Sequence, residues 1–192
     1  MTTIKKVWVF ASGNGTNAEK LFEYFKGHHA QIRITGLFCN RPAAGVTEKA
    51  RRAEIPVFTL TDAELEMPGN LLRLLRDQAV DEILLAGFLR KIPDDVVKAY
   101  ADHIINVHPA LLPKFGGKGM YGMRVHRAVK EAGETETGIT VHLVNEHYDE
   151  GRILFQASVA VLPEDTPETI AEKVQRLEHL HYARACEQYI AP

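Results

Sequence analysis

The fold is decided by a stretch near the start of the chain, Val7-Trp8-Val9-Phe10-Ala11-Ser12-Gly13-Asn14-Gly15-Thr16-Asn17. Its first part, Val7 to Ala11, is apolar and predicts a buried strand. A glycine-rich turn follows, and the apolar residues between Asn17 and Phe25 are spaced as on one side of a helix. The chain therefore opens with the strand, tight turn and helix of an α/β fold.

Strands and helices alternate through the first half of the sequence. The predicted strands are apolar through their length rather than at every second residue, which indicates a parallel sheet covered on both faces. We therefore expect an α/β fold with a doubly wound, mostly parallel sheet and helices on both faces. The further predicted elements are strands at Ile32 to Cys39, Val57 to Leu60, Glu82 to Ala86 and Ile104 to Val107, and helices at Glu48 to Ala53, Leu71 to Gln78 and Asp94 to Tyr100.

The pattern changes in the second half, where a long loop rich in proline and glycine precedes a predicted helix, His126 to Ala132. Two strand-like runs follow, Gly138 to Val144 and Ile153 to Leu162, and the turn between them predicts an antiparallel pair. Thr166 is a candidate cap, and the proline after it favours a closing helix that runs to about Tyr189.

Length and composition indicate one domain over residues 1–192 that acts on small molecules. Lys and Arg number 23 and Asp and Glu 25, and the absence of a long basic run argues against a nucleic-acid partner. The two cysteines, Cys39 and Cys186, are too few for a disulfide framework and suit a reducing compartment. The apolar run Val7 to Ala11 is too short to cross a membrane. We expect a cytoplasmic protein without membrane association.

The turn Ser12 to Asn17 predicts a phosphate-binding site, because glycines let backbone N–H groups face an anion at the start of a helix. Its spacing also fits a dinucleotide-binding fingerprint, so an NADP-dependent oxidoreductase stays open. Against that function, the segment Cys39 to Arg41 supplies no acid for a ribose, although Arg41 suits a phosphorylated cofactor. A turn that needs glycine only for its dihedral angles is the remaining alternative.

Asn106 and His108 end the last predicted parallel strand and point to the same side of it. Ligands bind beyond the carboxyl ends of such strands, so the pair should face a pocket. An amide that donates to an oxyanion and an imidazole that moves protons suit acyl transfer. Asp149 lies in a turn that can return it to the same pocket, where a carboxylate would stabilise a protonated imidazole. Structural roles for each residue remain open.

Three further features bear on binding. The segment Leu85 to Ile92 follows a buried strand, and its backbone groups and apolar side chains suit a flat heterocycle or simple packing. Gln175 and Glu178 share one face of the closing helix. We predict no metal site, because the histidine pairs 142/147 and 179/181 lack suitable spacing and cysteine partners. The histidines expected at the surface are His28, His29 and His103.

Over essentially its whole length the chain resembles the glycinamide ribonucleotide (phosphoribosylglycinamide) formyltransferases, a folate-dependent family of purine biosynthesis. The resemblance is carried, in the family's order, by Ser-Gly-Asn-Gly-Thr-Asn from Ser12, Leu-Ala-Gly-Phe-Leu-Arg from Leu85, Asn-Val-His-Pro-Ala-Leu-Leu-Pro from Asn106 and the Asp-x-Gly turn at Asp149. It implies formyl transfer from 10-formyltetrahydrofolate to the amine of 5'-phosphoribosylglycinamide on the path to IMP. It also implies small-molecule substrates, no metal, and a monomer or homodimer.

The resemblance also implies roles for individual residues. The family's catalytic positions are matched by Asn106, His108 and Asp149. Those that hold the ribonucleotide are matched by Gly15, Thr16, Asn17, Gln175 and Glu178. The folate site would comprise Leu89, Arg90, Lys91, Ile92, Asn106, Asn145, Glu146, His147, Tyr148 and Asp149. A non-enzymatic nucleotide-binding module is a further alternative, which the joint presence of an amide, an imidazole and a carboxylate disfavours.

Two departures from the family pattern stand out. Many relatives carry an arginine that contacts folate in the segment matching Thr61 to Asn70, which is short here and contains no arginine. The loop after Pro113 is longer than usual, and Phe115 to Gly122 includes four glycines. This segment suits either a lid over the reacting groups or a packed surface loop.

Overall fold

The computed structural model describes residues 4–26 and 31–192. The surface positions expected for His28 and His29 lie outside the described residues. Within the described part, a seven-stranded sheet has the order β3-β2-β1-β4-β5-β6-β7. The parallel strands are β1 (Lys5–Phe10), β2 (Ile32–Phe38), β3 (Val57–Phe58), β4 (Glu82–Leu85) and β5 (Ile104–His108), and the antiparallel ones are β6 (Glu136–Leu143) and β7 (Ile153–Ala160).

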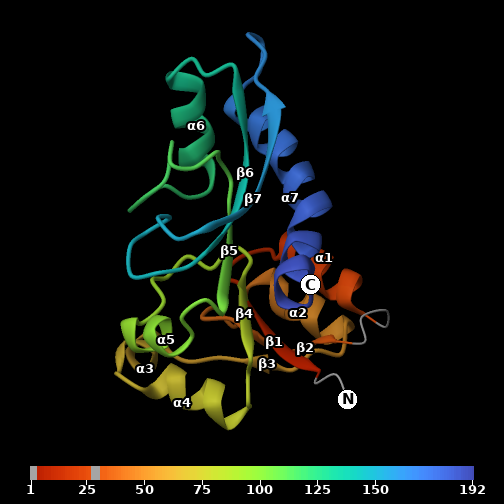
Figure 1. Ribbon diagram of the computed structural model, residues 1–192, viewed down its shortest axis with the longest axis vertical. Helices are drawn as coiled ribbons and strands as arrows, with labels where there is room; N and C mark the ends of the chain where they lie inside the picture. The colour runs from red at the N-terminus through yellow and green to blue at the C-terminus, as the bar shows by residue number, and fades with distance from the viewer. Residues whose placement is uncertain (1–3, 27–30) are drawn as a thin grey trace.

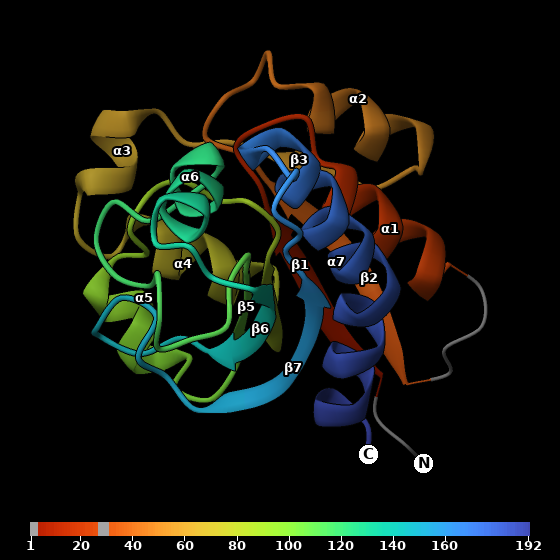
Figure 2. The ribbon, with the colours of Figure 1, turned by 90° about the horizontal axis from the view of Figure 1, so that it is seen from above.

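Helices cover both faces of the sheet (Figures 1 and 2). One face packs against α1 (Thr16–Phe25), α2 (Gly45–Arg52) and α7 (Pro167–Ile190), and α6 (Met123–Glu131) joins this core beside α7. The other face packs against α3 (Asp62–Glu66), α4 (Asn70–Asp77) and α5 (Asp94–Ala99). The expected doubly wound α/β fold with an antiparallel C-terminal part is confirmed.

Strand β1 shows why an apolar run becomes a central strand here. Val7 and Val9 enter the core on the α1 side, whereas Trp8 and Phe10 enter the core on the α4 side, and each is at most 1% exposed. Successive side chains of a strand point to opposite faces, so only a strand with helices on both sides needs apolar residues throughout. Burial of each large side chain contributes about 1.5–3 kcal/mol.

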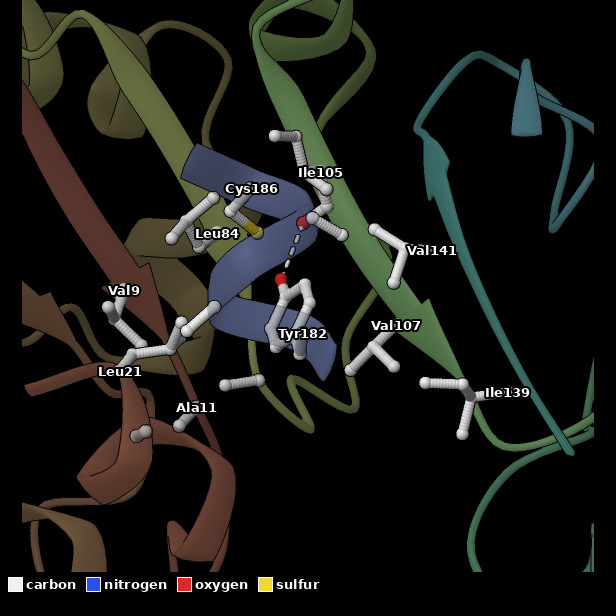
Figure 3. Close-up of a cluster of buried hydrophobic side chains, with 14 of the residues drawn as sticks. Val9, Ala11, Leu21, Leu84, Ile105, Val107, Ile139, Val141, Tyr182 and Cys186 are labelled. Atoms are coloured by element: carbon white, nitrogen blue, oxygen red, sulfur yellow. Dashed lines mark hydrogen bonds between the residues drawn. The ribbon is translucent and has the colours of Figure 1, made fainter. Parts of the chain in front are cut away.

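Tyr182 ties the closing helix to the middle of the sheet. Its side chain is fully buried, and its hydroxyl lies 2.9 Å from the carbonyl oxygen of Leu85. The same hydroxyl lies 3.0 Å from the carbonyl oxygen of Ile105, a contact drawn in Figure 3. The hydroxyl hydrogen serves one carbonyl at a time. Leu85 is the last residue of β4 and Ile105 the second residue of β5, so α7 is anchored to two neighbouring strands of the sheet.

Several element ends differ from the sequence predictions. Helix α6 begins at Met123 rather than His126, and β6 begins at Glu136 rather than Gly138. Helix α3 was not predicted. The Thr61 hydroxyl accepts from the Glu64 amide and the Glu64 carboxylate accepts from the Thr61 amide, so a capping box starts this five-residue helix. Strand β5 also pairs antiparallel with β6, which extends the expected antiparallel pair to three strands.

Candidate active site

A cavity of about 950 Å³ opens at the carboxyl ends of the parallel strands. The strand order reverses between β1 and β4, and open α/β sheets bind ligands at such a point. The size of the cavity fits one or two small molecules. It is lined by the loops after β4 and β5, the segment after β6, and side chains of α1 and α7.

Asn106, His108 and Asp149 converge on this cavity. Asp149 Oδ2 lies 3.5 Å from His108 Nδ1, and its Oδ1 lies 3.6 Å from Nε2 of His142. The Asn106 amide Nδ2 lies 3.0 Å from the same His142 nitrogen. His108 is 3% exposed and Asp149 has a positive φ of 59°, so the turn after β6 brings the carboxylate back toward β5. The arrangement predicted for these three residues is therefore present.

The hydrogen bonds define which ring nitrogens carry protons. His142 Nδ1 donates to the carbonyl of Leu143 at 2.8 Å, so its Nε2 accepts from Asn106. Burial lowers the pKa of His142, which keeps this imidazole neutral. The contact fixes the Asn106 amide with Nδ2 as the donor and leaves its second Nδ2 hydrogen for another acceptor.

His108 is held by the glycine-rich segment that follows it. Its Nε2 donates to the carbonyl of Phe115 at 2.8 Å, which leaves Nδ1 facing Asp149. The Gly117 amide donates to Asp149 Oδ2 at 2.9 Å. A Cβ on Gly116 would lie 2.5 Å from the end of the Leu112 side chain and 3.2 Å from Cβ of Asp149, so a larger residue would crowd this close approach. The segment thus contacts both titratable groups of the site, and residues 117–122 line the cavity.

The end of the cavity beside α1 and α7 carries polar groups. Asn17, Gln175 and Glu178 line it, and Asn17 Nδ2 donates to Glu178 Oε2 at 2.9 Å. Desolvation raises the pKa of Glu178 to about 6. Neither Gly15 nor Thr16 is among the residues that line the cavity. The Thr16 hydroxyl accepts from Gln175 at 3.2 Å.

Steric crowding and a positive φ require glycine at position 15. Its φ is +70°, and a Cβ there would lie 2.3 Å from the Val46 side chain. The dihedral requirement considered from the sequence therefore holds at this glycine. It coexists with the start of α1 at Thr16, where backbone N–H groups lack partners within the helix.

The other part of the cavity is formed by the loops after β4 and β6. Its lining comprises Leu89, Arg90, Lys91 and Ile92 after β4 and Asn145, Glu146, His147 and Tyr148 after β6. The amide of Leu89 donates to the Ser12 hydroxyl at 3.0 Å, which joins the loop after β4 to the turn after β1. Phe88 packs edge-on against Phe10 at a centroid distance of 5.4 Å. A flat ring between these loops would meet the apolar side chains of Leu89 and Ile92 and the ring of Tyr148.

Sequence reasoning missed two histidines of the cavity. His142 sits opposite Asn106 in the antiparallel register of β5 and β6, which no local pattern reveals. His126 on α6 is 6% exposed, its Nδ1 has no hydrogen-bond partner among the described residues, and burial lowers its pKa. In the described part of the chain no three His, Cys, Asp or Glu side chains are grouped to hold a metal ion.

Comparison with known proteins places the chain in a family. The formyl transferase family matches residues 5–186, and the chain belongs to this family. A chloroplastic phosphoribosylglycinamide formyltransferase of Arabidopsis thaliana is 43% identical over 97% of this chain and 67% of its own length. The Bacillus subtilis phosphoribosylglycinamide formyltransferase is 37% identical over 97% of this chain and 95% of its own length. The chain spans only 60% of a similar Vigna unguiculata protein.

Solved structures that resemble this chain carry the same names as the sequence relatives. The phosphoribosylglycinamide formyltransferase of Brucella melitensis superposes with a TM-score of 0.88 at 34% identity, covering 99% of this chain and 97% of that one. A glycinamide ribonucleotide transformylase of Geobacillus kaustophilus gives a TM-score of 0.89 at 33% identity over 98% of this chain and 100% of that one. None of the helices within the described residues is long and apolar enough to span a membrane.

Proposed function

We propose that this protein transfers the formyl group of 10-formyltetrahydrofolate to the amine of 5'-phosphoribosylglycinamide in purine (IMP) biosynthesis. The observation that carries the proposal is the convergence of Asn106, His108 and Asp149 on one cavity between two chemically different ends. The polar end, with Asn17, Gln175 and Glu178, suits a phosphoribosyl group. The products are the formylglycinamide ribonucleotide and tetrahydrofolate.

The polar end supports a ribonucleotide rather than a dinucleotide cofactor. Asn14 and Asn17 of the first turn and helix reach the cavity, and the helix dipole of α1 favours a phosphate beside them. Glu178 and Gln175 supply acceptors and donors for ribose hydroxyls. Gly15 and Thr16 would contribute backbone N–H groups. The Cα of Gly15 lies against Val46 of α2, and the Thr16 hydroxyl is bonded to Gln175 of α7.

The part of the cavity between the loops after β4 and β6 supports the folate. Leu89, Ile92 and the aromatic ring of Tyr148 supply walls for a flat pterin ring, and the loops at 87–92 and 144–148 supply backbone donors and acceptors. The formyl-bearing nitrogen would then lie beside Asn106 and His108, with the glutamate of the folate directed to the cavity mouth near Arg90 and Lys91.

The reaction needs an oxyanion donor and a proton carrier. The glycinamide amine attacks the formyl carbon, and the second Nδ2 hydrogen of Asn106 donates to the developing oxyanion. His108 supports this charge and moves a proton from the attacking amine to N10 of the folate as the carbon–N10 bond breaks. Asp149 balances the imidazolium charge at Nδ1. The Phe115 carbonyl holds the Nε2 hydrogen of His108, so the segment 115–122 must shift before that hydrogen reaches a substrate.

The test is the release of tetrahydrofolate from 10-formyltetrahydrofolate, followed with and without 5'-phosphoribosylglycinamide. Release that requires the ribonucleotide supports the proposal. Release at the same rate without it would indicate hydrolysis instead. Calorimetric binding of NADP without binding of the ribonucleotide would favour the oxidoreductase alternative. Both cysteines are free and buried, which suits a reducing compartment such as the cytoplasm. The resemblance to the family is the basis for expecting a monomer or homodimer.

A further inference from the structure

The acidic helix α3 lies beside the proposed folate site, and two of its carboxylates form ion pairs with Arg90, which lines the cavity. Arg90 places Nη2 2.7 Å from Glu66 Oε1 and Nε 4.0 Å from Asp62 Oδ1. Figure 2 shows α3 on the opposite flank from α1 and α7, which carry the polar end. Helix α3 lies within the segment Thr61 to Asn70, where many members of the family carry a folate-contacting arginine and this chain has none.

Every cation along this part of the cavity has an acidic partner. Lys91 Nζ lies 2.7 Å from Asp94, and the nearby Lys98 lies 3.6 Å from Glu146. On the glycine-rich segment, by contrast, Lys118 has no carboxylate partner within 4.0 Å in the described part of the chain. Neutralised cations are therefore a feature of the folate end and not of the whole cavity.

We propose that Glu66, assisted by Asp62, determines which folates the site prefers by competing with their carboxylates for Arg90. This inference rests on the proposed function, since it assumes a folate with its glutamate directed to this mouth. Folates differ in the number of γ-linked glutamates that they carry, and each additional glutamate adds a negative charge. Glu66 thereby makes the site indifferent or unfavourable to a longer glutamate chain.

The geometry suits competition rather than a permanent lock. The side chains of Glu66 and Asp62 are 71% and 65% exposed, so their pairing with Arg90 is screened by water and can be exchanged. The helix itself is held in place, because Leu65 is buried in the core and Thr61 caps the first turn. When a ligand carboxylate replaces Glu66 and Asp62 as the partner of Arg90, the fixed helix keeps both acidic side chains nearby. They then repel a second or third glutamate within a screening length of about 8 Å.

Calorimetry with tetrahydrofolate that carries one or three glutamates tests the inference. The wild type should bind the two forms within about twofold of each other. Glu66→Gln should bind the three-glutamate form about two- to fivefold more tightly than the wild type does, with a smaller gain for the one-glutamate form. Asp62→Asn should act in the same direction but less, because it lies farther from Arg90. About 0.5 M salt should reduce these differences.

The matched control is Glu23→Gln, which removes a carboxylate from a pair of equal length, 2.7 Å to Lys20, outside the cavity. This control should bind both folates as the wild type does. A wild type that gains several-fold with three glutamates, or a Glu66→Gln variant whose gain is absent or equal for both folates, would overturn the inference. Because binding is measured without turnover, failure of formyl transfer in the separate release assay remains distinguishable from failure here.

Discussion

Replacing Glu178 with glutamine should stabilise the protein at neutral pH and weaken its binding of the phosphorylated substrate. Glu178 lies on α7 at the polar end of the cavity, and one oxygen accepts a hydrogen bond from Asn17 at 2.9 Å. Desolvation raises the pKa of its carboxyl from an ordinary 4.5 to about 6. Glutamine keeps an oxygen for Asn17 but carries no charge to desolvate.

The sign of the effect follows from proton linkage. Because the folded protein holds the Glu178 proton more tightly than the unfolded chain, the stability that it contributes is fully present below about pH 4.5. This contribution is lost as the pH rises through about 6. The displacement of the pKa limits the loss to about 2 kcal/mol at about 1.4 kcal/mol per pH unit. Glu178→Gln should therefore gain up to about 2 kcal/mol at pH 7.5, or about 4–8 °C in Tm, and little at pH 4.5.

The assay is urea unfolding of the wild type and the variant at pH 4.5 and pH 7.5, together with steady-state kinetics. The KM for 5'-phosphoribosylglycinamide should rise about tenfold, because a charged acceptor for ribose hydroxyls is lost. A variant that is less stable than the wild type at pH 7.5, or equally affected at both pH values, would refute the desolvation account. Stability gained at the expense of binding is the pattern expected of a binding residue.

Three further perturbations probe the site and its support. Replacing residues 115–122 with a short Gly-Ser bridge removes the contacts to His108 and Asp149. Turnover should fall about 100-fold while Tm falls by only a few degrees. Unaltered kinetics in a folded variant would leave only a surface-loop role. Asp149→Asn should lower kcat by about 100-fold in the release assay, since a neutral amide cannot balance an imidazolium, and a change in KM alone would contradict that role. Tyr182→Phe should cost about 1–2 kcal/mol in urea unfolding by leaving the carbonyls of β4 and β5 short of a donor, and an unchanged midpoint would show that this bond contributes nothing net.

The main strands were predictable because burial on both faces leaves a direct trace in the sequence. Val7 to Ala11 is apolar at every position, and the structure covers both sides of β1. Helix α3 left no such trace, since five residues with one buried leucine show no period. The only sequence signal for this helix is the capping box of Thr61 and Glu64. The apolar pattern that follows it is too short to predict a helix.

The candidate site was partly predictable for a similar reason. The two-residue period of a strand places Asn106 and His108 on one side regardless of the rest of the fold. His142 was out of reach, because its place opposite Asn106 depends on the antiparallel register of β5 and β6. The pairing of Glu66 with Arg90 was equally hidden, since it joins residues that only the packing of α3 brings together. Long-range contacts of this kind have no local signature.

The most direct test of the account is the turnover of Asn106→Ala and His108→Ala in the tetrahydrofolate release assay with saturating 5'-phosphoribosylglycinamide. Each variant should fold as the wild type does, as judged by urea unfolding, and lose about 100-fold or more in kcat, the scale for an oxyanion donor or an acid-base group. A folded variant at either position that retains near-wild-type kcat would contradict the assignment of the catalytic site.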